Sequence, residues 1–373
     1  MFFPPRKLCI TQRNRGLSGG LFSVYERMVN MSGLYTKEGF LNQTYIQTLA
    51  DYNNISFIVE IGGRQVGKTY GTLDLMLRQH RKFILMRRTI SEMEFICNDI
   101  NNPFTAHRDF MTEIKKDTKY TGGVYLISHD SDPEYIAALM ALSAVAKIRG
   151  FNGDIYSDLI FDEFIPENHV TRIRAEGEAF LNAIVTISGN RELSGRPPLR
   201  SWLLANSNNL NSPILQILNI MEKVEDMRDH DQEISIMKDR GIMIILPKSE
   251  QIMDARKKTA IFKAISPDSE FARMAFGNEF SYNDDSNIKH VNIREYILKY
   301  ICGELAYYKH KDKSEYYVCC HVTGTAKEYP PTLRGRTKCL MDNPMIKKRY
   351  FNGKTYFESL SIKERFLDYF INV

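Results

Sequence analysis

A short glycine-rich segment has residue types and a spacing suited to holding phosphate groups. It matches the pattern GxxxxGK[ST], and its members are Gly62, Gly63, Arg64, Gln65, Val66, Gly67, Lys68 and Thr69. Gly62 and Gly67 allow the main chain to turn so that successive N–H groups point at phosphate oxygens. Lys68 can reach the outer phosphates, and the Thr69 hydroxyl is a ligand for Mg²⁺. The segment therefore predicts a site for ATP with Mg²⁺.

Two acidic residues that follow an apolar run supply a second chemical group. The run ends at Asp162, and Glu163 comes directly after it. Asp162 is predicted to ligate Mg²⁺ from the end of a buried strand, and Glu163 to act as the general base for the attacking water. The sequence lacks the NKxD motif of GTPases, and a small-molecule kinase needs no water-activating glutamate. With Lys68 as a catalytic cation, these residues favour ATP hydrolysis.

A polar run after another apolar strand offers a group that can sense the terminal phosphate of ATP. Residues 201–205 read as a buried strand, and Asn206 stands at its end. An amide in that position can report whether the γ-phosphate is present, so Asn206 is predicted to be a nucleotide-binding residue. Ser207 and Asn208 are alternatives from the same run, and a plain turn at the strand end explains the same residues.

Two arginines are candidates for stabilising the transition state of phosphoryl transfer, in which charge spreads over the phosphate oxygens. Arg191 follows a predicted helix and precedes the strand that ends at Asn206, so it is predicted to act on the nucleotide of a neighbouring subunit. Arg149 precedes the acidic strand and is the second candidate. A surface position with no catalytic role explains either arginine equally well.

The elements that must position these groups alternate between helix and strand. The expected order is helix 37–52, strand 56–61, helix 69–80, strand 82–87, hairpin 120–127, helix 133–145, strand 158–162, helix 176–187 and strand 201–205. A strand, loop, helix and strand in succession form a βαβ unit, which favours parallel pairing. The expected fold class is α/β, a P-loop NTPase of the ASCE type with a mostly parallel sheet.

Changes of pattern along the chain divide it into four segments. They are an N-terminal extension over 1–40, an ATPase domain over 41–250, a linker or hinge over 251–287 and a C-terminal domain over 288–373. The linker holds a basic helical stretch, 256–263, and a polar, turn-rich stretch, 277–287. Strand-like runs and a final amphipathic helix, 362–370, predict a small α+β fold for the C-terminal domain.

The C-terminal domain is the basic part of the chain. Residues 288–373 carry an excess of Lys and Arg over Asp and Glu that exceeds the net charge of +5 of the whole chain. A basic domain on a near-neutral body favours an anionic polymer as its partner. A surface that merely keeps the domain soluble explains the same charge.

The cysteines and the apolar runs argue against several other classes of protein. None of the six cysteines is spaced as Cys-x-x-Cys, which favours reduced thiols in a cytosolic setting. The group of Cys302, Cys319, Cys320, His321 and Cys339 is therefore not expected to hold a metal. The longest apolar run, Tyr135 to Leu142, is too short to cross a bilayer, and the first residues lack a secretion signal. We expect no membrane partner.

Taken together, these motifs resemble those of the bacteriophage DNA-packaging ATPases of the terminase large-subunit type. The chain looks most like the short form found in small podoviruses whose motor carries a packaging RNA. The segments that match are 61–70, 83–88, 159–165, 189–192, 205–207 and, more weakly, 350–353. The Arg64-Gln65 pair inside the glycine loop is typical of terminases. The 40-residue N-terminal extension has no counterpart in this pattern.

This resemblance implies a homomeric ring, expected to be a pentamer, on the portal of an empty prohead in the host cytoplasm. The ring is expected to drive double-stranded DNA inward at the cost of ATP. Position by position, Lys68 and Thr69 bind nucleotide, Asp162 and Glu163 are the magnesium and water acids, and Asn206 couples hydrolysis to movement. Arg191 acts in trans. The basic residue that the family places before the acidic strand is Lys147 or Arg149.

Larger terminases end in an RNase H-like nuclease that needs several acids around two metals. The acids of the C-terminal domain are scattered, so a degenerate nuclease-like domain without nuclease activity is expected; they are Glu304, Asp312, Glu315 and Asp342. The basic clusters 334–338 and 347–349 suit contacts to the backbone of DNA or of packaging RNA. Two rivals stay open: another nucleic-acid-dependent P-loop ATPase of the helicase or AAA type, and a non-catalytic nucleic-acid-binding scaffold.

Overall fold

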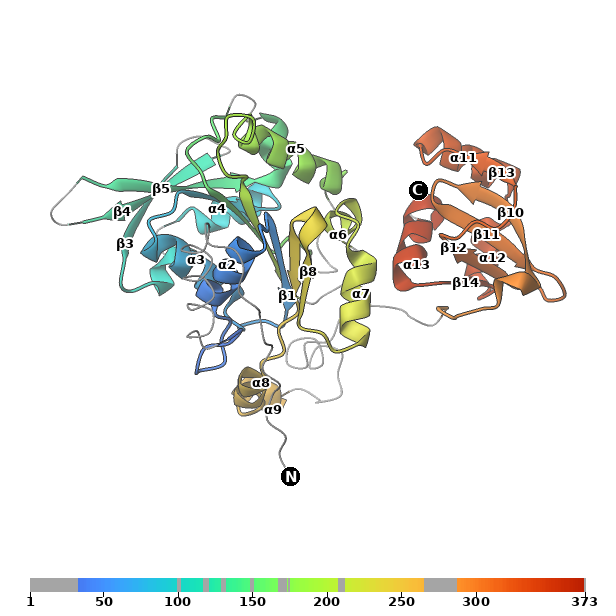
Figure 1. The fold of residues 1–373 in the computed structure, drawn as a ribbon, viewed down its shortest axis with the longest axis horizontal. Coiled ribbons are helices and arrows are strands. Elements are labelled where there is room, and N and C mark those ends of the chain that lie inside the picture. Colours follow the sequence, from blue (N-terminus) through green and yellow to red (C-terminus); the bar gives the residue numbers. More distant parts are fainter. Residues whose placement is uncertain are drawn as a thin grey trace, which may run out of the picture.

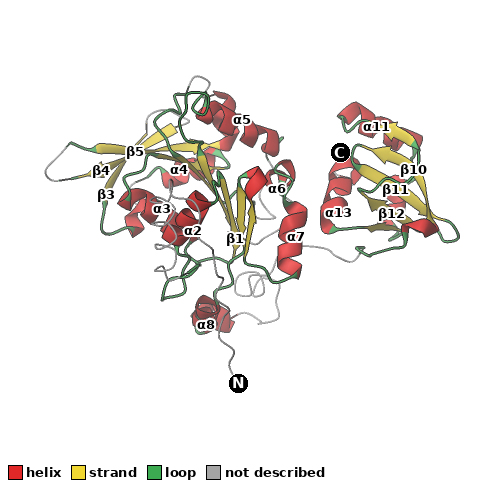
Figure 2. Ribbon diagram, in the orientation of Figure 1, coloured by secondary structure: helices red, strands yellow, loops and turns green. Residues whose placement is uncertain are grey.

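The computed structural model describes residues 33–98, 102–116, 121–128, 132–147, 151–166, 173, 175–206, 212–264 and 287–371. These residues form two lobes, each built on its own sheet (Figure 1). The first lobe has a nine-stranded sheet with helices on both faces, and the second has a five-stranded sheet (Figure 2). Among the described helices, none combines the length and the hydropathy required to span a bilayer.

The nine-stranded sheet has a parallel centre and antiparallel edges. Its order is β3-β4-β5-β2-β6-β7-β1-β9-β8, and the six strands from β5 to β9 in this order run parallel. The bounds are β1 Phe57–Gly62, β2 Phe83–Arg87, β3 Met111–Lys116, β4 Thr121–Ile127, β5 Glu134–Ala141, β6 Asp158–Asp162, β7 Arg200–Asn206, β8 Ile234–Met237 and β9 Ile242–Ile245. The predicted α/β class with a mostly parallel sheet is confirmed.

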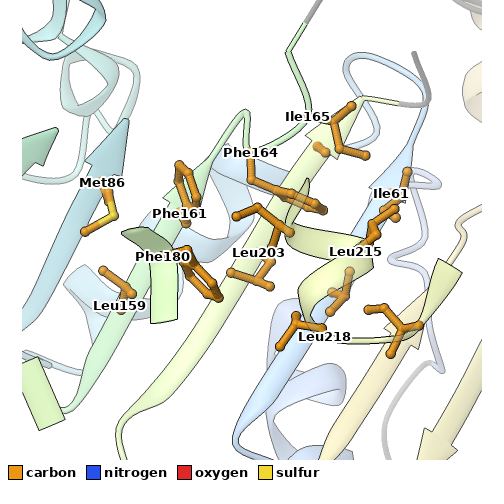
Figure 3. Packing of buried hydrophobic residues seen from close by; sticks show 14 of the residues in the cluster. Ile61, Met86, Leu159, Phe161, Phe164, Ile165, Phe180, Leu203, Leu215 and Leu218 are labelled. Carbon is orange, nitrogen blue, oxygen red and sulfur yellow. The ribbon is translucent and has the colours of Figure 1, made fainter. Parts of the chain in front are cut away.

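Helices cover both faces because the central strands are apolar on both sides. On one face lie α2 (Gln43–Tyr52), α3 (Lys68–Arg78) and α4 (Ile90–Ile96), and on the other lie α5 (Glu176–Ser188), α6 (Pro213–Ile217) and α7 (Met221–Asp229). Successive β1 residues alternate between these cores, with Ile58 packed towards α3 and Val59 towards α5 and α6. Figure 3 shows Phe161 of β6 beside Phe180 of α5 in the second core.

The helix predicted over residues 133–145 is wrong. This segment is strand β5, which pairs in parallel with β2 and is followed by the 3-10 turn Leu142–Lys147. Its residues from Ile136 onward are buried. A continuous apolar run of this length does not distinguish a doubly buried strand from a buried helix. In the folded chain the segment is a strand because it pairs with the edge of β2 that faces away from β6.

The hairpin predicted within residues 120–127 is also misplaced. The described residues of this segment, Thr121–Ile127, form a single strand, β4, and its hairpin partner is the preceding strand β3. Gly122 and Gly123 therefore lie inside β4 instead of forming a turn. A side chain at Gly122 would approach Cys97 Sγ to 3.2 Å, so close packing against α4 accounts for this glycine.

Two predicted helices differ from the structure at their boundaries. The helix expected from residue 37 begins at Gln43, because the Asn42 side chain accepts a hydrogen bond from Tyr45 N–H and caps the helix. The basic helix expected over 256–263 is two short helices, α8 (Glu250–Lys257) and α9 (Ala260–Ala264). The rest of the predicted linker, up to residue 286, and residues 1–32 lie outside the described residues.

The second lobe has the strand order β13-β10-β11-β12-β14. Its strands are β10 Tyr296–Cys302, β11 Leu305–His310, β12 Tyr316–Cys319, β13 Lys327–Tyr329 and β14 Thr355–Phe357, and its helices are α11 Leu333–Asp342, α12 Ile346–Phe351 and α13 Leu360–Phe366. A short π-helical turn, Leu367–Ile371, follows α13. Stacked aromatic residues, including Tyr300, Tyr307 and Phe366, fill the core of this lobe.

The two lobes meet where α13 approaches α7 of the first lobe (Figure 1). The buried carboxylate of Glu225 on α7 accepts hydrogen bonds from the N–H groups of Leu360 (3.0 Å) and Ser361 (3.3 Å). The Leu360 side chain packs into the core of the first lobe. Gln216 also donates to Asp368 across the boundary. The lobes are therefore joined by a specific, partly buried contact.

Candidate nucleotide-binding site

The glycine-rich loop connects the end of β1 to the start of α3. Gly67 caps α3 in the left-handed conformation (φ 93°), and Gln65 also has a positive φ of 62°. A side chain at Gly67 would meet Phe40 Cβ at 3.2 Å, so both the backbone and the space favour glycine there. The loop carbonyls turn inward, and Lys68 Nζ donates to the main-chain oxygens of Gly62 (2.9 Å) and Gly63 (2.7 Å).

The acidic pair lies beside this loop. Asp162 ends β6, and its Oδ1 accepts a hydrogen bond of 2.9 Å from Thr69 Oγ1 at the start of α3. Its neighbour Glu163 has a positive φ of 57°, which turns the chain sharply at the end of the strand. The side chain of Asp162 is buried, whereas that of Glu163 is 57% exposed. One acid therefore faces the threonine while the other can reach solvent.

Asn206 completes the same edge of the sheet. It ends β7, the strand between β1 and β6, and its Oδ1 lies 3.4 Å from Lys68 Nζ. A cavity of about 270 Å³ opens at this point, and its lining is Arg64, Gln65, Gly67, Lys68, Thr69, Tyr70, Asp162, Glu163, Ala205 and Asn206. The parallel strands place their C-terminal ends together, so three separate segments meet at one cavity.

A second cavity of about 650 Å³ lies next to the first and shares Gln65, Gly67 and Tyr70 with it. Another wall is the segment 36–44, which leads into the first turn of α2. The Phe40 and Tyr70 side chains are 43% and 51% exposed, and Tyr70 stacks on His107 with 4.3 Å between ring centroids. A mainly apolar hollow with exposed aromatic rings thus adjoins the polar cavity of the glycine loop.

Burial changes the charge balance behind the loop. Lys68 is buried, and desolvation lowers its pKa to about 8, although the carboxylates of Glu60 and Asp162 attract a proton to it. Glu60 on β1 is fully buried, and desolvation raises its pKa to about 7. The Gln43 amide donates to Glu60 at 3.0 Å. The ammonium group of Lys68 therefore lies against main-chain carbonyl oxygens, and its pKa is only slightly above neutral pH.

These features fit a nucleotide with a divalent cation. The Thr69 hydroxyl and the Asp162 carboxylate are adjacent oxygen ligands of the kind that Mg²⁺ prefers. The N-terminus of α3, which begins at Lys68 directly after the loop, suits phosphate oxygens.

Comparison with known protein families assigns the chain to one of them. The family described as podovirus DNA encapsidation protein (Gp16) matches residues 39–305, which is more than half of the chain. The chain belongs to the Gp16 family. It is thus a podovirus DNA packaging protein, and the resemblance seen in the sequence is confirmed.

Solved packaging motors share the fold of this Gp16 family member. The Phi-28 gp11 DNA packaging motor superposes with a TM-score of 0.60 at 16% identity, covering 91% of this chain and 99% of that chain. The bacteriophage Phi-29 viral genome packaging motor assembly gives a TM-score of 0.60 at 19% identity, covering 89% and 97%. Identities this low show likeness of fold alone. No curated protein matches the chain.

One Gp16 residue that the sequence analysis passed over stands in the centre of the site. Arg87, at the end of β2, forms ion pairs with Asp162 (2.8 Å) and with Glu163 (2.7 Å). β2 is the neighbour of β6 in the sheet, so the arginine lies beside the two acids. In the sequence, Arg87 is only a basic residue at the end of a predicted strand. Its position beside the two acids can be inferred only once the strand order is known.

Glu60 and Gln43 were also missed. Glu60 interrupts an apolar strand, and an acid that is fully buried beside a lysine is a functional-site signal in its own right. Gln43 reaches Glu60 from α2, which precedes β1 in the chain. That contact has no signature in the sequence.

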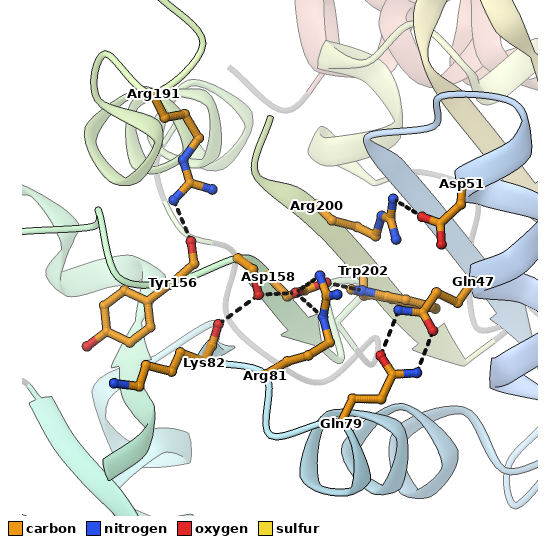
Figure 4. Close-up of polar contacts among 11 residues, drawn as sticks. Gln47, Asp51, Gln79, Arg81, Lys82, Tyr156, Asp158, Arg191, Arg200 and Trp202 are labelled. Atoms are coloured by element: carbon orange, nitrogen blue, oxygen red, sulfur yellow. Dashed lines mark hydrogen bonds and ion pairs between the residues drawn. The ribbon is translucent and has the colours of Figure 1, made fainter. Parts of the chain in front are cut away.

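Arg191 does not lie at the cavity of the glycine loop. Its side chain is 5% exposed, and Nη2 donates to the main-chain oxygen of Tyr156, just before β6 begins (Figure 4). It also donates to the main-chain oxygen of Gly153. Desolvation lowers the pKa of its guanidinium. Within one subunit, Arg191 therefore fixes the loop that enters β6, and its action on a neighbouring subunit stays a prediction.

A polar network joins the strands to the helices at the end of the sheet where β6 begins, opposite the glycine loop. The buried Asp158 accepts hydrogen bonds from Arg81 and from Trp202 Nε1, and Arg200 pairs with Asp51 of α2 (Figure 4). Arg149 and the alternatives Ser207 and Asn208 lie outside the described residues. Lys147, the other candidate, is exposed.

Proposed function

We propose that this Gp16 family member is the ATP-hydrolysing subunit of a motor that moves double-stranded DNA into a prohead. The observation that carries the proposal is the 2.9 Å hydrogen bond between Thr69 and Asp162, because it joins the phosphate loop to the acid that ends β6. The position of β7 between β1 and β6 supports the ASCE type of P-loop ATPase.

Mg²⁺ with ATP is the expected occupant of the polar cavity, with Thr69 and Asp162 as its protein ligands. The cation would neutralise charge on the phosphates. Lys68 now donates to loop carbonyls, and phosphate oxygens offer it a stronger, charge-assisted partner. The main-chain N–H groups of residues 62–67 would hold the remaining phosphate oxygens, and Arg64 and Gln65 are exposed at the rim.

Glu163 is the proposed general base, and Arg87 is proposed to position it. The two are paired at 2.7 Å, so the Arg87 guanidinium holds the carboxylate in position beside the cavity. A base must also contact the attacking water, so Glu163 has to exchange part of this ion pair for the water. Arg87 stays paired with Asp162 in that exchange.

The apolar cavity is proposed to hold the adenosine of ATP. Phe40 and Tyr70 offer exposed ring faces on which a purine can stack, and Gln65 and Gly67 connect this hollow to the phosphate loop. Gly71 of α3 is required here, since a side chain would meet Gln43 Cγ at 2.8 Å. The segment 36–44 is therefore proposed as the base-binding wall.

Asn206 is proposed to sense the γ-phosphate. Its amide oxygen lies 3.4 Å from Lys68 Nζ. A change in the hydrogen-bond partner of the lysine therefore alters a contact at the end of β7. β7 also contacts β1 and β6, which carry the loop and the acids. Loss of the γ-phosphate could thus be passed into the centre of the sheet.

We keep Arg191 and Arg149 as proposed trans-acting groups in a homomeric ring, with a pentamer as the expected size. For Arg191 this requires that the loop before β6 opens at the subunit contact, since the side chain now bonds to that loop. Assemblies in which a few subunits carry Arg191→Ala test it. A trans role predicts activity loss greater than the fraction of variant subunits, and a structural role predicts proportional loss.

The second lobe is proposed to contact DNA, packaging RNA or the portal through α11 and α12. Arg336 and Arg349 lie over the rings of Tyr369 and Tyr316, which gives them a packing role. The exposed Arg334, Lys338 and Lys348 are left for phosphate contacts.

The acids Glu304, Glu315 and Asp342 are paired with different partners, which supports a lobe without nuclease activity. The partners are Arg365, Lys289 and Lys327, respectively.

The first test is Glu163→Gln in the full chain. The amide keeps the shape of the side chain but cannot accept the proton of water, so ATP hydrolysis should fall by at least about a hundredfold while ATP binding persists. Prohead-dependent DNA uptake should stop with it. A non-catalytic scaffold would keep DNA uptake in the variant, and a helicase-type ATPase would respond to single strands instead of duplex with proheads.

A further inference from the structure

Three side chains with metal-ligating atoms meet at one edge of the second sheet. β12 and β14 are parallel neighbours, so the residues that follow them emerge at the same edge. Cys320 and His321 follow β12, and Glu358 follows β14. Their ligand atoms all lie within 4.8 Å of one another. The sequence hides this group, because Glu358 is far from the Cys-His pair along the chain.

The distances between the ligand atoms, with either oxygen of the Glu358 carboxylate taken as a ligand, are close to those around one tetrahedral metal ion. Cys320 Sγ lies 3.6 Å from His321 Nδ1 and 3.5 Å from Glu358 Oε2, and His321 Nδ1 lies 2.9 Å from Glu358 Oε1. Ordinary zinc bond lengths with tetrahedral angles give about 3.5 Å between sulfur and nitrogen or oxygen, and about 3.3 Å between nitrogen and oxygen. A metal ion can thus enter with small side-chain shifts.

Contacts within the group hold its side chains together, since Cys320 Sγ and His321 Nδ1 both contact the Glu358 carboxylate. The Cys320 N–H also donates to Glu358 at 3.1 Å and so holds the carboxylate in place. The site is open on one side, since His321 is 74% exposed.

We propose that Cys320, His321 and Glu358 form a binding site for a zinc-like divalent metal, with the fourth position open to water. A thiolate, an imidazole and a carboxylate suit Zn²⁺ or Co²⁺ and do not suit Mg²⁺, which prefers oxygen ligands. The site is therefore distinct in metal preference from the oxygen ligands Thr69 and Asp162. Metal binding links the end of β12 to the segment that leads from β14 into α13.

This link has a structural consequence at the boundary between the lobes. Glu358 stands two residues before Leu360, whose N–H bonds to Glu225 of the first lobe. A metal that fixes Glu358 therefore fixes the entry into α13. Metal loading should raise the melting temperature of the full chain, because the metal binds the folded form and not the unfolded one.

The test is a Co²⁺ titration of the reduced, metal-free full chain, followed by near-ultraviolet absorption. The expected result is one equivalent of Co²⁺ with a sulfur-to-cobalt charge-transfer band, and displacement of that band by Zn²⁺. Cys320→Ser should abolish the band, and Glu358→Gln should weaken Zn²⁺ binding by at least about tenfold. The ATP site has no sulfur ligand, so cobalt at Thr69 and Asp162 gives no such band.

Cys97→Ser is the matched control, because Cys97 is a half-buried thiol that lies on the first lobe. It should leave the cobalt band and the zinc affinity unchanged. Absence of the band in the native chain, or its persistence in Cys320→Ser, would overturn the proposal and leave the group as a hydrogen-bonded triad. Either result is independent of ATP hydrolysis.

Discussion

The charge state of one buried lysine governs the proposed phosphate site. Lys68 is buried, and its hydrogen-bond partners are two neutral main-chain carbonyls and the Asn206 amide oxygen. Desolvation lowers its pKa to about 8, so the ammonium form is only moderately favoured at neutral pH. A triphosphate brings negative charge next to the amine and raises that pKa again. Binding and protonation are therefore linked.

We predict that the affinity for Mg²⁺-ATP falls as the pH rises above about 8. The free protein binds fewer protons at Lys68 than the complex does in this range, so binding requires proton uptake and the dissociation constant rises by up to about tenfold per pH unit. Below this range the lysine is already charged and the effect should vanish. Calorimetric titrations in buffers of different ionisation enthalpy measure both the affinity and the protons taken up.

Lys68→Arg is the matched variant for this experiment, because a guanidinium stays charged throughout the range. Its weaker binding should be independent of pH up to about 9. An unchanged pH dependence in the variant would show that another group takes up the proton.

At the level of elements, the site depends on which strand ends are neighbours. Asp162 and Glu163 face Arg87 because β2 and β6 pair in parallel, and both face the loop because β7 bridges β6 to β1. A residue at one strand end can therefore control groups on another.

We predict that Arg87→Gln lowers the turnover of ATP by about tenfold or more, with a smaller change in ATP affinity. Without the guanidinium, the two carboxylates repel each other, and Glu163 loses the group that positions it. Steady-state kinetics separate the two effects, since kcat should fall more than KM changes.

Arg81→Gln is the control for the loss of an ion pair. Arg81 pairs with Asp158, which begins β6, whereas the partner of Arg87, Asp162, ends that strand. It should lower the melting temperature while kcat of the folded fraction stays close to that of the native protein. Equal kinetic effects of the two substitutions would contradict a positioning role for Arg87.

The elements around the site differ in how far they can be predicted from the sequence. β1, the glycine loop and α3 follow one another without a break over residues 57–78, so their types and positions can be predicted from local patterns. β5 was misread as a helix because its identity depends on the free edge of β2, and nothing local distinguishes the two. Arg87 and Gln43 were missed for the same reason, since each depends on contacts between distant segments.

For the whole molecule, the contact between the lobes is the feature that can transmit a change at the nucleotide to the basic helices of the second lobe. Glu225 of α7 holds the start of α13, and Leu360 completes the core of the first lobe. Desolvation raises the pKa of Glu225 to about 7, although the two N–H groups favour its charged form. The contact therefore contains a group that titrates near neutral pH.

We predict that the contribution of Glu225 to stability grows as the pH falls from about 8 to about 5. The folded pKa lies above that of an unfolded glutamate, so the folded form binds more protons in this window and protonation favours it. The free energy of unfolding of Glu225→Gln should lack this part of the pH dependence. Glu60 has the same sign of shift and is present in both proteins, so the difference between them isolates Glu225. A constant difference across the range would contradict the prediction.

The most direct test of the whole account is the binding of ATP to the purified full chain with and without Mg²⁺. We predict one site per chain with a micromolar dissociation constant that weakens markedly when Mg²⁺ is removed. Lys68→Ala should reduce the affinity by at least about a hundredfold, which corresponds to about 2.7 kcal/mol. Absence of Mg²⁺-dependent binding in the native chain, or equal affinity in Lys68→Ala, would contradict a nucleotide site at the loop between β1 and α3.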